Sequence, residues 1–209
     1  KKIEELITKD TVAIMPVHVF GVPCDVKSIE EIAKKHNLKV IYDAAHAIGS
    51  TCEEKSLLSF GDISATSLHA TKLFNTGEGG ACITEDTELT KRIDRIRFFG
   101  HDLNKDIVED GFNGKMTEIH AALGLANLEN FDNILETRKA KYKLYIEQLS
   151  YLKNIKFQEV KFGTSNFSYF PVVFQTEELL TKVEKVLTER NIFPRRYFHP
   201  SLNRLEHIV

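Results

Sequence analysis

VAIMPVHVFGVPCDVKSIEEIAKKHNLKVIYD, residues 12–43, is the stretch that decides the fold class. It opens with an apolar, β-branched run, residues 12–19, which suits a strand buried on both faces. Asp25 then stands where it can cap a helix in which Ile29, Ile32, Ala33 and His36 fall at i, i+3, i+4 and i+7. A second buried strand, residues 39–42, ends at Asp43. Strand, helix and strand at this spacing predict one βαβ unit of a parallel sheet.

The α/β pattern continues along the rest of the chain. Strands are predicted at residues 62–72, 80–85 and 168–174, and helices at 87–100, 116–126, 135–152 and 179–187. The polar loop 101–114 is long for a connector, so we expect it to be either functional or disordered. We predict one part of a large α/β domain over residues 1–130, and a connecting helix with part of a smaller α/β domain over residues 131–209. Because the sequence starts without Met in what resembles the middle of a helix, we expect a piece of a longer protein.

Composition favours a small-molecule partner. The formal charge is -2, so no excess of basic residues is present to bind nucleic acid or an anionic membrane. No run approaches the ~20 apolar residues of a membrane span. The three cysteines are far apart and form no CxxC pair, which favours a reducing, cytoplasmic location over a disulfide framework or a zinc site.

A lysine stands in the segment SLHATKLFNTGEGG, residues 67–80, between an apolar strand and a cluster of glycines. Most lysines are solvated surface charges, and Lys72 taken alone fits that alternative. The glycines at 77, 79 and 80 permit close approach of the backbone to a bound group. A lysine partly removed from water has a lowered pKa, and its neutral amine can form a Schiff base. Lys72 is therefore a candidate catalytic residue.

Asp43 lies at the carboxyl end of a buried strand, where open α/β sheets bind their ligands. A carboxylate in such a place needs a cationic or hydrogen-bonding partner. It could cap the following segment, DAAHAIG, or it could keep a pyridinium nitrogen protonated, so that the ring of pyridoxal phosphate withdraws electrons. His46 would face the same side if the segment turns, and it could hydrogen-bond the ring hydroxyl. A histidine taken alone in such a place is more often a structural residue.

Ser67 and Asn113 are less distinctive. The hydroxyl of Ser67 could donate to the cofactor phosphate, or it could bond to the backbone at the strand end. Asn113, in GFNGKM, has the character of a turn residue beside two glycines. Other chemistries lack their spacing: GEGG precedes a strand instead of opening a helix, and no GxSxG or HExxH occurs. Hydrolase, metalloenzyme and dinucleotide-binding functions therefore have no motif behind them, and no metal site is predicted.

Three segments carry a resemblance to a known family: PVHVFGVPCDVKSIEEIAKKHNLKVIYDAAHAIGS, SLHATKLFNTGEGG and GFNGKMTEIHAALGLANL. In this order they resemble the DegT/DnrJ/StrS family of sugar aminotransferases. The resemblance implies the aspartate-aminotransferase fold, which is fold type I of the pyridoxal-phosphate enzymes: a mostly parallel sheet flanked by helices, with a small C-terminal α/β domain. It covers residues 10–130, and further along only RRYFHPSL is similar. The family's N-terminal phosphate loop and ring-stacking aromatic have no counterpart here, nor has the end of its small domain.

The resemblance also implies roles for single residues. Lys72 matches the lysine of the internal aldimine, and Asp43 matches the partner of the pyridine nitrogen. His46 stands where the family has Gln or His near the ring oxygen, and Ser67 matches the phosphate-binding serine. Asn113 matches an asparagine that reaches the phosphate of the neighbouring subunit, which implies a homodimer with a shared active site.

The implied reaction is transamination of a nucleotide-linked keto-deoxysugar, of the dTDP-4-keto-6-deoxyhexose type, with glutamate as the amino donor. Arg195 and Arg196 could contact the diphosphate, although adjacent arginines are often surface charges. Two alternatives stay open. A dehydrase of the same family would carry His in place of Lys72, and an inactive binding module would be expected to have lost Lys72 or Asp43.

Overall fold

The structure is a computed structural model that describes residues 2–208. Contacts divide the chain into two compact units. The first consists of Lys1–Ser150 and Glu159–Pro171, and the second of Tyr151–Gln158 and Val172–Val209. The first unit therefore includes Glu159–Pro171, although this segment follows part of the second unit in the sequence. The domain boundary at residue 130 stays a prediction.

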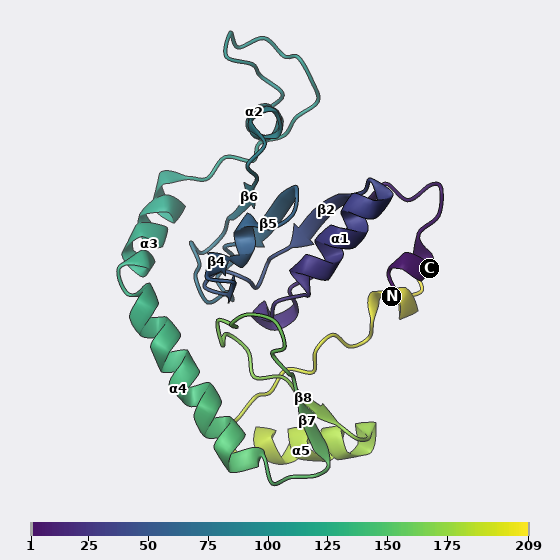
Figure 1. The fold of residues 1–209 in the computed structure, drawn as a ribbon. Helices are drawn as coiled ribbons and strands as arrows, with labels where there is room; N and C mark the ends of the chain where they lie inside the picture. Colours follow the sequence, from purple (N-terminus) through teal and green to yellow (C-terminus); the bar gives the residue numbers. More distant parts are fainter. Residues whose placement is uncertain (1, 209) are drawn as a thin grey trace. The chain divides into compact units, whose positions relative to one another are not determined.

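A four-stranded sheet is the centre of the first unit (Figure 1). Its strands, in spatial order, are β1 (Ala13–Ile14), β2 (Lys39–Asp43), β5 (Ile63–Ser67) and β6 (Gly80–Ile83). The first three are parallel, and β6 runs antiparallel to β5. Because the connections between parallel strands bring their carboxyl ends to one edge, Asp43 and Ser67 end neighbouring strands on the same side. The mixed, mainly parallel sheet agrees with the predicted fold class.

Helix α1 (Val26–His36) completes the predicted βαβ unit. Asp25 caps it, because the side-chain carboxylate accepts a hydrogen bond from Ser28 N at 3.1 Å. The helix ends at Asn37, which adopts the left-handed conformation with φ 54°. Its buried face packs on β2 in a core made of Val26, Ile29, Ala33, Val40, Tyr42, Ala44, Ala47, Cys52 and Leu57. Burying a large aliphatic side chain of this kind is worth roughly 1.5–3 kcal/mol, so this packing fixes the strand that ends at Asp43.

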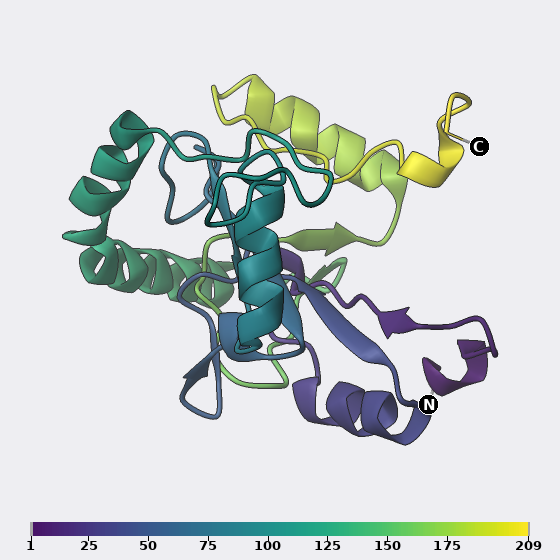
Figure 2. The same cartoon turned by 90° about the horizontal axis from the view of Figure 1, so that it is seen from above.

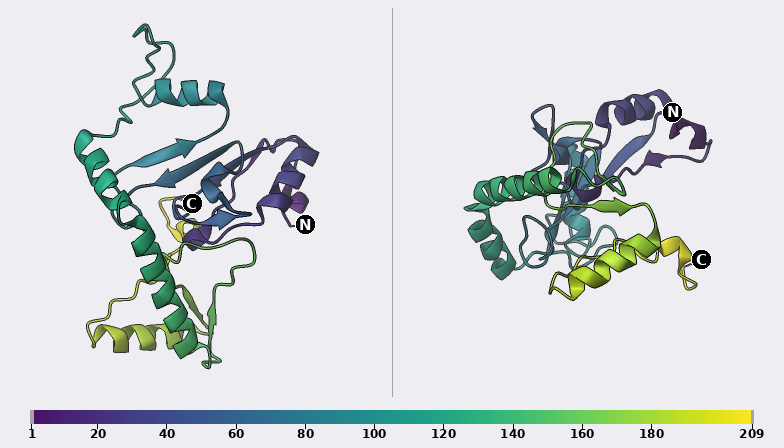
Figure 3. Two further views of the ribbon diagram at one scale, coloured as in Figure 1. Left: turned by 60° about the vertical axis from the view of Figure 1, so that its left-hand side comes forward. Right: turned by 90° about the horizontal axis from the view of Figure 1, so that it is seen from below.

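The first unit also contains the hairpin of β3 (Thr51–Cys52) and β4 (Lys55–Ser56), and the helices α2 (Thr87–Ile96), α3 (Glu118–Leu128) and α4 (Phe131–Leu149). Figure 2 shows the chain changing direction between α3 and α4, and Figure 3 shows the loop after α2 extending away from the sheet. Phe131 of α4 packs edge-on against Phe74, with ring centroids 5.6 Å apart. Among residues 2–208, no helix is both long and apolar enough to span a membrane.

Several predicted elements are shorter or shifted, among them the helix expected at 87–100, which ends at Ile96 as α2. The strand expected at 12–19 is interrupted near Pro16, which has no N–H to donate, and pairing resumes only as an isolated bridge between Val17 and Asp43. The strand expected at 62–72 ends at Ser67, because the following residues bond within their own loop. The helix expected at 135–152 is α4, which begins earlier, at Phe131, and ends at Leu149.

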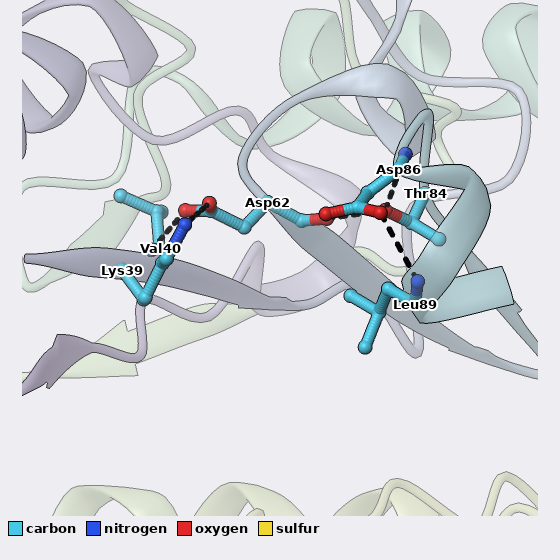
Figure 4. Close-up of polar contacts among 6 residues, drawn as sticks. All are labelled: Lys39, Val40, Asp62, Thr84, Asp86 and Leu89. Atoms are coloured by element: carbon cyan, nitrogen blue, oxygen red, sulfur yellow. Dashed lines mark hydrogen bonds and ion pairs between the residues drawn. The ribbon is translucent and has the colours of Figure 1, made fainter. Parts of the chain in front are cut away.

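Polar contacts at the opposite end of the strands hold the sheet in register (Figure 4). The carboxylate of Asp62 accepts hydrogen bonds from Val40 N at 2.8 Å and from Lys39 Nζ at 2.7 Å. The Thr84 hydroxyl donates to the Asp62 carbonyl oxygen at 2.6 Å, and Asp86 caps α2. Burial raises the pKa of the Asp62 carboxyl, but the hydrogen bonds from Lys39 and Val40 outweigh burial and hold this pKa below its usual range.

The second unit is a small α/β structure. Strands β7 (Ile155–Phe157) and β8 (Val172–Phe174) pair antiparallel, and α5 (Glu177–Thr188) follows with Thr176 as its N-cap. The helix was predicted, whereas β7 was not. The strand predicted at 168–174 is correct only for its last three residues, because Ser168–Pro171 belong to the first unit.

Candidate functional site

The loop that carries Lys72 is closed by its own backbone. Leu68 N donates to Gly79 O at 2.9 Å, and Ala70 N donates to Gly77 O at 2.7 Å. Gly77 has φ +77°, a conformation that favours glycine. The glycines therefore let the loop fold back on itself, and this turn places Lys72 beyond the carboxyl end of β5.

A pocket opens beside Lys72 in the first unit. Three of the predicted site residues line it: Lys72, His46 and Ser67. The rest of its wall comes from Ala45, Ile48, Leu73, Phe74, Asn166, Ser168 and Tyr169. An amine, an imidazole and a hydroxyl thus converge from separate segments on one concavity at the end of the parallel strands, where ligands of such sheets bind.

Asp43 ends β2 beside this pocket. One oxygen of its carboxylate accepts a hydrogen bond from Ala45 N at 3.0 Å, so the side chain does help to shape the turn that follows. The backbone of Asp43 bonds on both sides to the preceding segment, through Pro16 O at 2.9 Å and His18 N at 3.0 Å. Asp43 is held in place by its main chain, and its negative charge acts on two neighbouring histidines, His18 and His46.

His46 is the half-buried imidazole of the pocket. Its Nδ1 accepts a hydrogen bond from Phe20 N at 3.2 Å, which leaves the proton of the neutral ring on Nε2. Burial lowers the pKa of His46, the positive charge of Lys72 lowers it further, and Asp43 opposes both. At neutral pH the ring is therefore a neutral hydrogen-bond donor, and its pKa depends on the charges of Lys72 and Asp43. Its plane lies parallel to Phe20, with ring centroids 6.1 Å apart.

Ser67 shows both of the behaviours considered for it. Its hydroxyl oxygen accepts a long hydrogen bond from His69 N, at 3.3 Å, as an ordinary serine at a strand end does. The residue also lines the pocket with Lys72. The hydroxyl hydrogen is not engaged by that bond, so Ser67 can still donate to a ligand.

Three pocket residues were missed by the sequence reasoning: Asn166, Ser168 and Tyr169. They belong to Glu159–Pro171, which returns to the first unit after β7. Tyr169 packs against His46, with ring centroids 4.7 Å apart. Nothing in the local pattern marks these residues, because their role depends on contacts with a segment far away in the sequence.

His18 was also missed. It is completely buried and stacks on Tyr42, with ring centroids 4.6 Å apart. Its Nδ1 accepts a hydrogen bond from Cys24 N at 3.1 Å. Burial lowers the pKa of His18 to about 4, although the charge of Asp43 pulls it upward. A histidine inside an apolar run gave no signal of this in the sequence.

The other predicted site residues are not in this pocket. Asn113 is exposed in the loop after α2, where its backbone bridges to Phe98. Arg195 and Arg196 lie in the second unit. There, Arg196 donates to the Glu177 carboxylate at 2.6 Å, and the Arg195 guanidinium lies 5.4 Å from the centre of the Tyr197 ring. The roles of these three residues stay predictions.

The donor set suits pyridoxal phosphate. A primary amine, a carboxylate at a strand end, a neutral imidazole N–H and a hydroxyl match the aldehyde, pyridine nitrogen, ring oxygen and phosphate of that group. The described part of the chain has no cluster of three or more His, Cys, Asp or Glu side chains arranged to hold a metal ion. Lys72, Asp43, His46 and Ser67 are the residues that would hold such a cofactor.

The chain is similar in sequence to curated proteins and in structure to solved proteins. The curated dTDP-4-amino-4,6-dideoxy-D-glucose transaminase of Shigella dysenteriae is 44% identical over 96% of this chain and 55% of its own length. DesI, solved in the presence of its TDP-sugar product, superposes with a TM-score of 0.87 at 32% identity, covering 99% of this chain and 54% of that one. A structure described as a PLP-dependent aminotransferase from Bacillus cereus gives 0.84 at 29% identity, covering 99% and 56%.

This chain thus spans about half the length of the proteins that it matches. The structural neighbours confirm the predicted fold, and they point to pyridoxal phosphate as the cofactor. The family model of the DegT/DnrJ/EryC1/StrS aminotransferases matches residues 1–207. The chain therefore belongs to the DegT/DnrJ/EryC1/StrS aminotransferase family.

Proposed function

We propose that this chain serves a pyridoxal-phosphate-dependent aminotransferase that acts on a nucleotide-linked keto-deoxysugar. The observation that carries the proposal is the pocket, which brings Lys72, His46 and Ser67 together beside Asp43. The proposed substrate is of the dTDP-4-keto-6-deoxyhexose type, which the similarity to the Shigella transaminase and to DesI supports. Glutamate is the proposed amino donor.

Lys72, Asp43 and His46 each have a defined task in this proposal. The amine of Lys72 would hold the cofactor at its aldehyde, and the same amine would move the proton between carbon atoms during the reaction. Proton transfer by a positioned side chain of this kind typically contributes ~10²–10⁴ in rate. When bound, the cofactor supplies an electron-withdrawing ring. Asp43 keeps the ring nitrogen protonated, and His46 donates its Nε2 proton to the ring oxygen.

Phosphate and diphosphate groups complete the proposed site. The Ser67 hydroxyl donates to the cofactor phosphate. Asn113 reaches the same phosphate from a second copy of the chain, so the proposed assembly is a homodimer. Arg195 and Arg196 contact the nucleotide diphosphate. We further propose a cytoplasmic enzyme that provides amino sugars for lipopolysaccharide or another glycan.

Covalent labelling tests the proposal. The protein is mixed with pyridoxal phosphate, reduced with borohydride, and digested for mass spectrometry. We expect one modified peptide, with the label on Lys72, and we expect a Lys72→Arg variant to lose that label. A surface lysine such as Lys115 serves as an internal control, since nonspecific modification would label it equally. A folded protein with no preferential label on Lys72 would support the inactive binding module instead.

Product analysis separates the enzymatic alternatives. Protein mixed with pyridoxal phosphate, and not reduced, is given glutamate and a dTDP-4-keto-6-deoxyhexose. Transamination places a new nitrogen on the sugar, whereas a dehydrase product contains none. If glutamate reacts while no keto sugar is converted, the sugar substrate is wrong and the aminotransferase remains.

A further inference from the structure

Asn166 is a buried amide whose hydrogen-bonding groups are all used on one loop and its own turn. The residue is 1% exposed. Its Nδ2 donates to His46 O and to Ile48 O, each at 2.7 Å. Its Oδ1 accepts from Ser168 N at 3.2 Å. Both amide hydrogens are therefore directed at the loop Ala44–Ser50, which carries the imidazole of the pocket.

Ser50 ties the same region to a third segment. Its hydroxyl donates to Gly21 O at 2.6 Å and accepts from Asn166 N at 3.0 Å. A pair of backbone hydrogen bonds between Thr51 and Thr164, at 2.9 and 2.8 Å, continues the junction. Three stretches that are far apart in the sequence, near residues 20, 48 and 166, thus meet at one buried polar network. Such networks specify a single arrangement when every member is satisfied.

The network sets the position of the His46 ring. The carbonyl of His46 is one of the two that Asn166 binds, and its imidazole lies against Phe20 and Tyr169 on the pocket side. In the sequence, Phe20 directly precedes Gly21, and Tyr169 follows shortly after Asn166. We propose that Asn166 is a positioning residue of the site, whose amide fixes the loop Ala44–Ser50 and thereby holds the imidazole of His46 in the pocket beside Lys72.

The amide is required by the chemistry of its partners. Two carbonyl oxygens need two donors, which the neutral amide supplies from one nitrogen. A leucine has nearly the same shape but no donors, so both carbonyls would be left buried and unsatisfied. The loop would then move toward water to regain hydrogen bonds. Because both amide hydrogens of Asn166 are used on the loop, the proposed effect of the amide on the site passes through His46.

Titration of His46 tests this inference. The inference rests on the proposed function, because that function makes the pocket beside Lys72 a cofactor site. Histidine ring carbons are labelled, and the His46 signal is assigned by its absence in a His46→Gln variant. The pKa of His46 is then measured by NMR in the full chain and in Asn166→Leu, without added cofactor. We expect the pKa to rise toward the ordinary value in Asn166→Leu, because burial is the largest cause that lowers it.

A remote variant separates positioning from general destabilisation. Thr84→Val removes a partly buried hydroxyl donor at the opposite end of the sheet without changing charge. It should leave the His46 pKa unchanged. If Asn166→Leu is folded and its His46 pKa equals that of the original protein, the inference is overturned.

Asn166→Ser decides the matter if Asn166→Leu does not fold. Serine is smaller than asparagine and removes the amide that bonds to His46 O and Ile48 O, so a rise of the His46 pKa supports the inference, and no rise overturns it. Labelling of Lys72 is read separately. A shifted His46 pKa together with an unlabelled Lys72 would disprove the proposed function while leaving Asn166 as the residue that positions the loop.

Discussion

The contact between Gly21 and the network around Asn166 allows a quantitative test with Gly21→Ala. Gly21 has φ +76°, where an L-residue pays roughly 1–2 kcal/mol. An added Cβ would collide with the Asn166 side-chain oxygen and would stand 2.7 Å from His46 O. Overpacking of this kind costs about 1–3 kcal/mol more. We therefore expect Gly21→Ala to lower the free energy of unfolding by about 2–5 kcal/mol.

Gly77→Ala is the matched control. Gly77 has almost the same backbone conformation, with φ +77°, but its Cβ would meet only His120 and Leu123 side chains at 3.4 Å and beyond. The control should therefore lose only the conformational part, about 1–2 kcal/mol. Urea unfolding of the three proteins, followed by circular dichroism, measures both changes. If the two variants lose equal stability, the close packing of Gly21 on the network is wrong.

The remaining predictions concern two groups whose pKa differs between the folded and unfolded chain. His18 has a folded pKa of about 4 against 6.5 for an ordinary histidine, so the unfolded chain binds its proton first and stability should fall by about 3 kcal/mol as pH drops from 6.5 to 4. Urea unfolding across this pH range measures the decrease. In His18→Phe, which retains an aromatic ring stacked on Tyr42, the part of the decrease that is due to His18 should be absent. The Asp62 carboxyl has a lowered folded pKa through Lys39 and Val40, so its stabilisation is present above the unfolded pKa and is lost as pH falls through the folded one. Asp62→Asn should therefore be less stable than the original protein at pH 7, with the gap closing in acid; a gap that persists at low pH would contradict this account.

Local pattern was enough for the elements that pack on near neighbours. The apolar spacing of residues 26–36, the cap at Asp25 and the strand ending at Asp43 were all predicted and are all present. Position and side-chain chemistry made Lys72 and Ser67 candidates, the family resemblance gave them roles, and the structure places both in one pocket. The strand predicted at 12–19 was too long because the apolar pattern does not show that Pro16 lacks an N–H to donate.

The βαβ core, the family and a short set of candidate residues can be predicted from local sequence, because helical and strand periodicities and motif spacing are properties of neighbouring residues. The wall of the pocket that Asn166, Ser168 and Tyr169 supply depends on tertiary contacts. Asn166 bonds to a residue 120 positions earlier, and His18 owes its lowered pKa to burial beneath other segments. Such contacts depend on where the folded chain returns, and no local pattern encodes the place to which a distant segment comes back.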